Sequence, residues 1–124
     1  MANVPLVSVV DDDESVRESL RGLIRSVGLA VQVFGAAEEF LNSDHLGKTD
    51  CLILDVRMPG MNGFQLQRQL AASEHDIPII FITAHGFDEC ARSRALRDGA
   101  VAYLTKPFSE EALLEAINAA VSAK

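Results

Sequence analysis

Short apolar runs alternate with amphipathic segments along the whole chain, and this alternation restricts the fold more than any other feature of the sequence. Each run has the length of a buried strand, and each following segment carries apolar residues at helical spacing. The predicted strands are 6–10, 31–34, 51–54, 77–82 and 101–104, and the predicted helices are 16–27, 36–41, 63–72, 87–98 and 110–121. Strict alternation predicts a parallel sheet with right-handed crossovers and helices on both faces.

A five-stranded sheet of this kind most often takes the doubly wound order 2-1-3-4-5 of flavodoxin-like α/β folds. We therefore predict one domain of this class over residues 1–124. The run 51–54 is apolar at every position, as expected of a parallel strand that is buried on both faces. Apolar residues make up 48% of the chain and aromatic residues only 6%, so the core is expected to be aliphatic.

Turn and cap residues support these boundaries. Asn62 and Ser109 precede helices that they are suited to cap, and Gly28 and Gly99 stand where helices are expected to end. The segment 58–63 contains a proline and two glycines. We interpret it as a turn, with Gly60 and Gly63 in conformations that other residues avoid.

Charge and cysteine content restrict the possible functions. The formal net charge is −7, whereas direct nucleic-acid binding requires a surplus of Lys and Arg to contact phosphates. Cys51 and Cys90 lack CxxC spacing and are expected to be reduced thiols of a cytoplasmic protein. The run 6–10 is too short for a signal peptide or a membrane span, so no membrane association is expected.

Polar side chains stand where four of the predicted strands end. Asp11 and Asp12 follow the first strand, and Asp55 follows the third. Thr83 and Lys106 occupy the corresponding positions after the fourth and fifth strands. The carboxyl ends of parallel strands share one edge of the sheet, where α/β proteins gather their reacting groups. These five residues are therefore expected to converge.

Three converging carboxylates raise one another's pKa values unless a cation compensates their charge. Oxygen ligands of this kind favour Mg²⁺, which tends to bridge a carboxylate and a phosphate oxygen. Lys106 adds a fixed positive charge and Thr83 a hydroxyl donor, so the site holds the groups that phosphoryl transfer requires. Asp55 is the preferred nucleophile, because it stands between the acidic pair and the lysine and a carboxylate can form an acyl phosphate.

These motifs resemble those of receiver domains of two-component response regulators, and the resemblance extends over essentially the whole chain. It rests on Val10-Asp11-Asp12, on the segment 55–63, on Thr83-Ala84 and on Lys106-Pro107-Phe108. The resemblance implies that a sensor histidine kinase or a small phosphodonor phosphorylates Asp55. It also implies that Asp12, Asp55 and the backbone carbonyl of Arg57 bind Mg²⁺, with Asp11 acting through water.

By the same resemblance, Thr83 and Lys106 bind the phosphoryl group, and Tyr103 swings inward when Thr83 is drawn toward that phosphoryl group. The Lys106–Pro107 peptide bond is expected to be cis. Arg57 and His85 occupy positions that vary within the family. Because both are large and could flank the path of an attacking water, we predict that they set the lifetime of the phosphorylated state.

The segments 9–17 and 55–61 look most like receivers that are joined to a LuxR-type helix-turn-helix. This resemblance implies transcriptional output through a C-terminal DNA-binding domain beyond residue 124, while a stand-alone regulator stays open as the alternative. Whether phosphorylation drives formation of a homodimer through the fourth helix, the fifth strand and the fifth helix stays open on the sequence alone. The domain would be a signalling phosphoacceptor that catalyses its own phosphorylation and dephosphorylation, and not an enzyme with a separate substrate.

Other functions stay open on the sequence alone. Phosphatases that form an aspartyl phosphate place Asp-x-Asp after the first strand, as Asp11 and Asp13 do, but this chain lacks the threonine that follows. A flavodoxin-like electron carrier needs a hydroxyl- and glycine-rich loop where this chain has carboxylates. An interaction module that works without phosphorylation is disfavoured, since every acid, Thr and Lys position is filled. Labelling of Asp55 or of Asp11 by acetyl phosphate distinguishes a receiver from a phosphatase.

Overall fold

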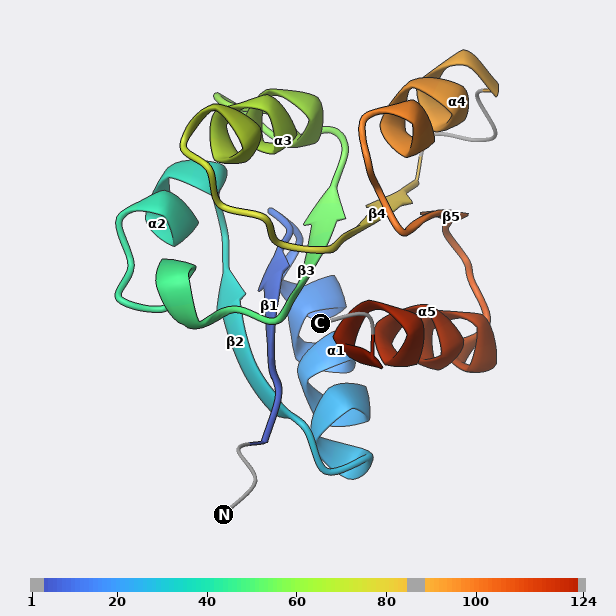
Figure 1. The fold of residues 1–124 in the computed structure, drawn as a ribbon. Helices are drawn as coiled ribbons and strands as arrows, with labels where there is room; N and C mark the ends of the chain where they lie inside the picture. The colour runs from blue at the N-terminus through green and yellow to red at the C-terminus, as the bar shows by residue number, and fades with distance from the viewer. Residues whose placement is uncertain (1–3, 85–88, 123–124) are drawn as a thin grey trace.

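The computed structural model describes residues 4–84 and 89–122. Five parallel strands form one sheet in the order β2-β1-β3-β4-β5, with helices on both faces (Figure 1). The strands are β1 (Leu6–Val10), β2 (Ala30–Phe34), β3 (Cys51–Asp55), β4 (Ile79–Thr83) and β5 (Ala102–Thr105). The helices are α1 (Glu14–Ser26), α2 (Ala37–Leu41), α3 (Gly63–Ala72), α4 (Glu89–Arg97) and α5 (Glu110–Ser122), with a short 3₁₀ turn η1 (Leu46–Lys48). The predicted fold class and strand order are confirmed.

The differences from the predicted boundaries are small and have local causes. The strand β4 begins only after Pro78, because proline has no N–H to donate to the ladder, although its carbonyl accepts from Leu52. The turn η1 follows no hydrophobic period and was not predicted. The predicted helix 87–98 begins outside the described residues, and its described part is α4. No described helix has both the length and the apolar character needed to span a lipid bilayer.

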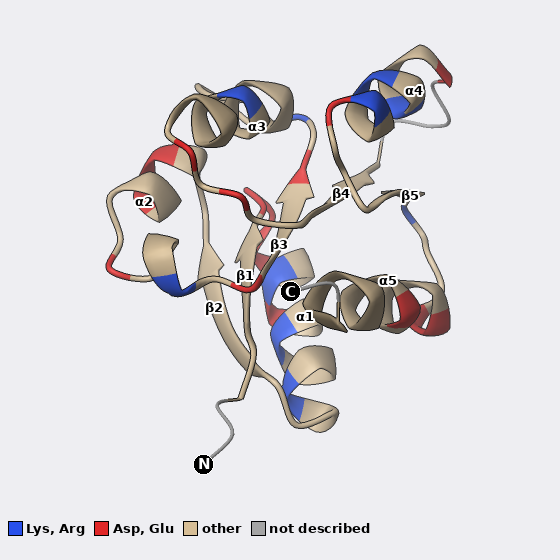
Figure 2. Ribbon diagram, in the orientation of Figure 1, with Lys and Arg blue, Asp and Glu red and all other residues tan. Residues whose placement is uncertain are grey.

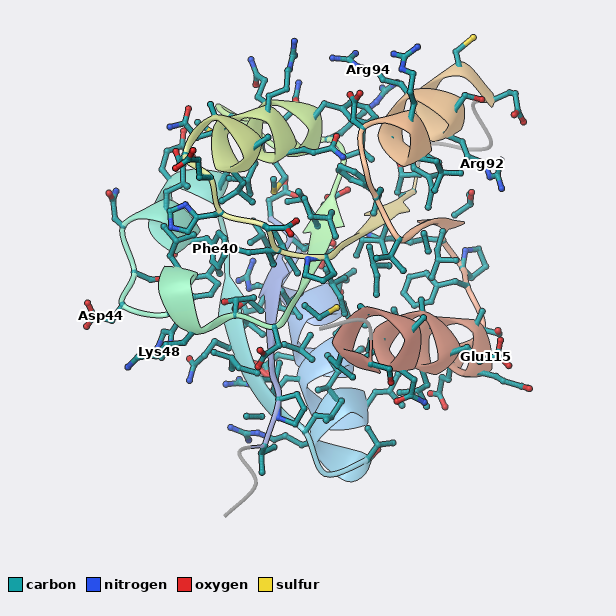
Figure 3. All side chains as sticks on the ribbon, in the orientation of Figure 1. Phe40, Asp44, Lys48, Arg92, Arg94 and Glu115 are labelled. Atoms are coloured by element: carbon teal, nitrogen blue, oxygen red, sulfur yellow. The ribbon has the colours of Figure 1, made fainter. Side chains whose placement is uncertain are left out.

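Alternate strand residues face opposite helix layers, and this produces two core clusters. On one face Leu52 and Leu54 pack with residues of α2, α3 and α4, among them the fully buried Phe40 (Figure 3). On the other face Ile53 packs with residues of α1 and α5, including Ile117. Every residue of β3 is buried, as its apolar sequence predicted. Asp55 therefore ends a strand that is enclosed along its whole length, as β4 is.

The predicted helix caps are present. The side-chain oxygen of Asn62 accepts from the backbone N–H of Gln65, whose side chain accepts from Asn62 N–H in return. The hydroxyl of Ser109 accepts from Ala112 N–H at the start of α5. At the end of α1, Gly28 adopts a φ of +85°, which favours glycine. These local signals fix where each helix begins and ends.

The end of α3 lacks the glycine that follows α1. Glu74 occupies the left-handed position there with φ of +61°, and no other non-glycine residue in the described ranges has a positive φ. We expect Glu74→Gly to raise the free energy of unfolding by about 1 kcal/mol, because glycine adopts this conformation without Cβ strain. Urea denaturation measures the change. Glu74→Ala retains the Cβ and should give no gain; an equal gain would attribute the effect to the lost carboxylate.

Candidate functional site

The register of the sheet brings the ends of the strands to one level. The last residues of the ladder pair Val10 of β1 with Leu54 of β3, and Thr83 of β4 with Thr105 of β5. Lys106 continues the last ladder, since its backbone N–H donates to the carbonyl of Thr83 at 2.7 Å. The residues that follow these strands consequently meet at the carboxyl edge of the sheet, where acidic residues gather at the ends of β1 and β3 (Figure 2).

Three carboxylates lie together at this edge. One side-chain oxygen from each of Asp11, Asp12 and Asp55 lies within 4.8 Å of the others. Asp11 is fully buried and Asp55 is 5% exposed, whereas Asp12 is exposed to solvent. A set of carboxylate oxygens at this spacing, with one member open to water, fits a hard divalent cation such as Mg²⁺, which keeps several waters when it binds.

Lys106 is bonded to the innermost carboxylate. Its Nζ donates to Oδ2 of Asp11 at 2.9 Å, and the Lys106 side chain is only 18% exposed. The other oxygen of Asp11 accepts from the backbone N–H of Asp13 at 2.9 Å. Lys106 thus pairs with the acidic residue after β1 and not with Asp55. The peptide bond from Lys106 to Pro107 is cis, as the resemblance implies.

Asp55 is a buried carboxylate whose protonation is shifted by its surroundings. Burial and the neighbouring charge of Asp11 raise the pKa of Asp55 to about 7, while Lys106 and a hydrogen bond from the backbone N–H of Arg57 act in the opposite direction. In the absence of a cation, Asp55 is therefore only partly ionised at neutral pH. A divalent cation in the cluster favours the ionised form, which is the nucleophilic one.

This raised pKa predicts a pH-dependent stability. Asp55 has an ordinary pKa of 3.8 when unfolded, so between about pH 4 and pH 7 the folded state binds a proton that the unfolded state has released. Without divalent cations, stability should therefore fall as the pH rises through this window, by at most about 1.4 kcal/mol per unit from this group. Thermal unfolding in EDTA should show Asp55→Asn and wild type nearly equal at low pH and the variant more stable at about pH 8. A constant difference between them would contradict the prediction.

The two predicted switch residues line one pocket. Thr83, 2% exposed at the end of β4, and the partly buried Tyr103 of β5 border a pocket of about 400 Å³. The ring centroid of Tyr103 lies 6.3 Å from that of the buried Phe81. The exposed Arg57 borders it as well. The switch movement and the role of Arg57 stay predictions, and His85 lies outside the described residues.

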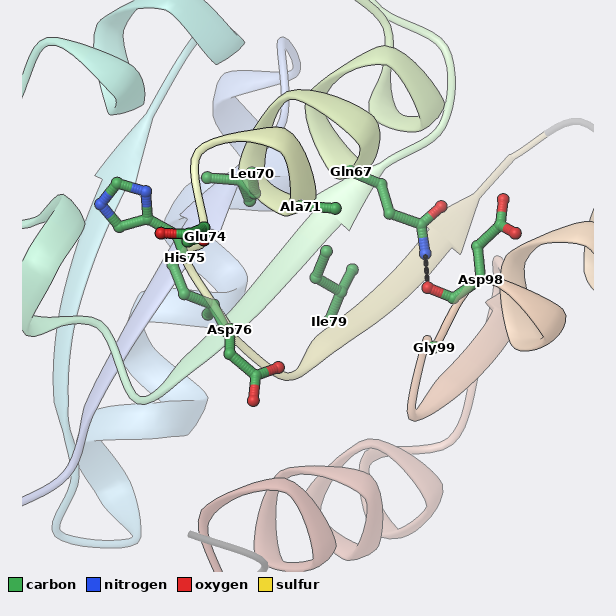
Figure 4. Close-up of a pocket in the computed structure, with 10 residues that line it drawn as sticks. Gln67, Leu70, Ala71, Glu74, His75, Asp76, Ile79, Asp98 and Gly99 are labelled. Atoms are coloured by element: carbon green, nitrogen blue, oxygen red, sulfur yellow. Dashed lines mark hydrogen bonds between the residues drawn. The ribbon is translucent and has the colours of Figure 1, made fainter.

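A second pocket, of about 430 Å³, lies at the opposite end of β4, beside Ile79 (Figure 4). There the amide of the buried Gln67 donates to the backbone carbonyls of Ala95 and Asp98, both at 3.3 Å, and so joins α3 to the end of α4. None of the predicted site residues lines this pocket. It has no part in the acidic site.

One residue of the acidic edge escaped the sequence-based prediction. Arg17 of α1 donates from Nη1 to the backbone carbonyl of Asp11 at 2.8 Å. Helical arginines are usually solvated, and no motif or spacing in the sequence distinguishes Arg17 from Arg21 and Arg25 on the same helix. The only available signal was its place one turn after the Asp11–Asp13 segment.

The fold and this edge define a class of protein. The doubly wound sheet, the three clustered carboxylates and the lysine occur together in a chain whose residues 7–118 match the model of the response regulator receiver domain. The chain belongs to this family, and it is a signalling domain rather than a classical enzyme. The family assignment excludes the flavin carrier and the phosphatase that the sequence had left open.

Individual curated proteins and solved structures are also similar to this chain. The chain is 49% identical over 116 residues to response regulator protein TodT of Pseudomonas putida, an alignment that covers 94% of this chain and 51% of TodT. It is 42% identical over 120 residues to transcriptional regulatory protein TdiR of Thauera aromatica, covering 97% of this chain and 52% of TdiR. The solved structure of response regulator StyR matches with a TM-score of 0.87 and 48% identity, covering 98% of this chain and 61% of that chain. The chain thus spans about half the length of the curated relatives that it matches.

Proposed function

We propose that Asp55 accepts a phosphoryl group from a sensor histidine kinase or a small phosphodonor, and that Asp11, Asp12 and Asp55 serve a Mg²⁺ site for this reaction. The observation that carries the proposal is the clustering of three carboxylates within 4.8 Å beside a lysine that is fixed on Asp11. Following the resemblance, Asp12, Asp55 and the backbone carbonyl of Arg57 would bind the ion, and Asp11 would act through water. When bound, Mg²⁺ supplies charge neutralisation for the phosphoryl oxygens.

The chain's own residues account for the transfer. A carboxylate oxygen of Asp55 forms the new P–O bond while the bond from phosphorus to the donor imidazole nitrogen breaks, and the departing nitrogen keeps the electron pair. Lys106 and the hydroxyl of Thr83 would bind phosphoryl oxygens that gain charge in this step. The buried position of Asp55 at the end of β3 would restrict the direction of attack, and such orientation is one of the main contributions that a protein makes to phosphoryl transfer.

The consequence of phosphorylation follows from the neighbours of Asp55. We propose that Thr83 moves toward the new phosphoryl group and that Tyr103 turns inward into the pocket that both residues line. Arg57, exposed at the mouth of that pocket, would set the lifetime of the acyl phosphate together with His85. The rate of phosphate release from phosphorylated Arg57→Ala and His85→Ala tests this role. A faster or slower rate supports it, and an unchanged rate in both variants contradicts it.

The output that we propose is control of transcription by a longer, cytoplasmic protein in which residues 1–124 form the receiver domain. The name of the relative TdiR, a transcriptional regulatory protein, supports this output, and a C-terminal LuxR-type domain would bind the DNA. A homodimer through α4, β5 and α5 is favoured by charge. The helix α4 carries the exposed Arg92 and Arg97, while the exposed Glu110 and Glu111 lie in the first turn of α5 and the exposed Glu115 follows them on the same helix.

Acetyl phosphate labelling tests the proposed function. With Mg²⁺, the intact mass should rise by one phosphoryl group, peptide mapping should place the label on Asp55, and EDTA should prevent it. Sedimentation of the same sample reports whether dimers form. A label on Asp11, or equal labelling in EDTA, would contradict the proposed site.

A further inference from the structure

The backbone between the two acidic residues after β1 is held by a side chain from α1. The backbone N–H of Asp11 continues the sheet ladder, since it donates to Phe34 O at 3.1 Å. The carbonyl of Asp11 lies beyond the end of the ladder, because the helix α1 begins three residues later. Nη1 of Arg17 donates to this carbonyl at 2.8 Å. Since Asp11 is fully buried, a lost partner would leave a buried carbonyl without its hydrogen bond.

With Arg17 in place, every polar group of Asp11 has a partner. Its N–H and carbonyl are bonded to Phe34 and Arg17, and its two carboxylate oxygens accept from Asp13 and Lys106. The peptide unit that Arg17 holds is the one that joins Asp11 to Asp12. Rotation of this unit would turn the Cα–Cβ bond of Asp12 relative to Asp55, and with it the carboxylate that completes the cluster.

The charge of Arg17 is not used in a direct ion pair. Among residues 4–84 and 89–122, no carboxylate forms an ion pair with its guanidinium, whereas Arg21, one turn further along α1, pairs with Glu18. The guanidinium lies instead against Gly35, where a Cβ would be 3.4 Å from Nη1. Basic residues follow the whole length of α1 (Figure 2). Of the three arginines of α1, only Arg17, which lies nearest the acidic edge, donates to a backbone carbonyl of that edge.

We infer that Arg17 is a positioning residue for the Mg²⁺ site: by bonding the carbonyl of Asp11, it fixes the peptide that aims the Asp12 carboxylate at Asp55. This inference rests on the proposed function, since it assumes that the three carboxylates bind the ion. The positioning role and simple charge repulsion predict changes of opposite sign in the Mg²⁺ affinity when Arg17 is replaced by an uncharged residue. Coulomb repulsion alone predicts that removal of a positive charge from this edge strengthens the binding of a cation. The positioning role predicts weaker binding.

Calorimetric titration with MgCl₂ separates the two effects. We expect Arg17→Met to weaken Mg²⁺ binding by about tenfold or more, the usual effect of losing a group that orients a metal ligand. Arg17→Lys, which keeps the charge and an N–H donor, should recover much of the affinity. Arg21→Met is the matched control, because it removes the same charge from the same helix without touching Asp11, and it should bind Mg²⁺ at least as tightly as wild type.

Phosphorylation by acetyl phosphate provides a second readout. In Arg17→Met the rate should be low at limiting Mg²⁺ and approach the wild-type rate at saturating Mg²⁺, because the site is misaligned and not destroyed. Circular dichroism at the titration temperature shows whether each variant is folded. If Arg17→Met does not fold, Arg17→Gln is used instead. The glutamine side chain is uncharged and shorter than arginine, so it should not make the same hydrogen bond to the carbonyl of Asp11.

The outcomes are distinguishable. Unchanged or tighter Mg²⁺ binding in the folded, uncharged Arg17 variant overturns the inference and leaves the proposed function intact. Weakening by the same factor in Arg21→Met also overturns it, because the loss of affinity would then not depend on the bond from Arg17 to Asp11. If wild type itself binds no Mg²⁺ and takes no label, the proposed function fails.

Discussion

Asparagine at position 55 is expected to abolish phosphoryl labelling by acetyl phosphate in Mg²⁺, with a loss of more than about a thousandfold in initial rate, as is usual when a nucleophile is removed. The amide keeps the size of the side chain, so the sheet edge and Lys106 are undisturbed. It has no carboxylate to form the acyl phosphate and removes one charge from the cation site. Intact-mass spectrometry at timed intervals measures the rate.

The matched control for this experiment is Asp13→Asn. Asp13 is exposed and caps α1 through its side chain, with Ser15 and Val16 as donors, and it lies outside the carboxylate cluster. Asparagine caps helices about as well as aspartate, so this variant should be stable and labelled at close to the wild-type rate. Labelling of Asp55→Asn at wild-type speed would show that another residue is the acceptor, and the site would have to be reassigned.

Alanine at position 63 is expected to be the most destabilising of the small changes near the site. Gly63 begins α3, and a Cβ there would lie 2.5 Å from the backbone oxygen of Asp55 and 3.1 Å from the Phe81 ring. Such a contact forces the start of α3 away from the end of β3. We expect a loss of about 3 kcal/mol in the free energy of unfolding, together with weaker Mg²⁺ binding because Asp55 moves. Thermal unfolding and titration measure the two effects.

Gly22→Ala supplies the control with the opposite sign. Gly22 lies on the exposed side of α1, and a Cβ there would meet nothing within 4 Å. Alanine favours the helix, so this variant should be more stable than wild type by up to about 1 kcal/mol. Equal effects of the two substitutions on stability would refute the steric explanation for Gly63.

The case of Gly63 also shows where interpretation of the sequence was incomplete. The two glycines of the segment 58–63 were both expected in conformations that other residues avoid. Gly60 has such a conformation, with φ of +76°, but Gly63 does not have a positive φ and begins a regular helix. Its lack of a side chain matters because the backbone of β3 passes close by. That requirement concerns space, and local sequence does not encode it.

The position of Asp55, by contrast, followed from sequence. A run of apolar residues that ends at an aspartate places the carboxylate at the end of a buried strand, and alternation with helices places that strand in a parallel sheet. The switch point of the order 2-1-3-4-5 then sets Asp55 beside Asp11 and Asp12, which the structure shows. Periodicity and topology are repeated along the whole chain, so local errors of one or two residues do not change the result.

The pairing within the site depended on tertiary structure. Lys106 bonds Asp11, 95 residues away, and not Asp55, whose pKa is raised mainly by burial. Arg17 donates to a backbone carbonyl, and because every residue has one, the sequence does not indicate which carbonyl a side chain will bind. By itself the sequence determined the fold class and the residues that meet at the sheet edge, because hydrophobic period and strand order decide both. Only the folded chain decided which of them touch, because a hydrogen bond or a steric clash depends on differences of an ångström or less.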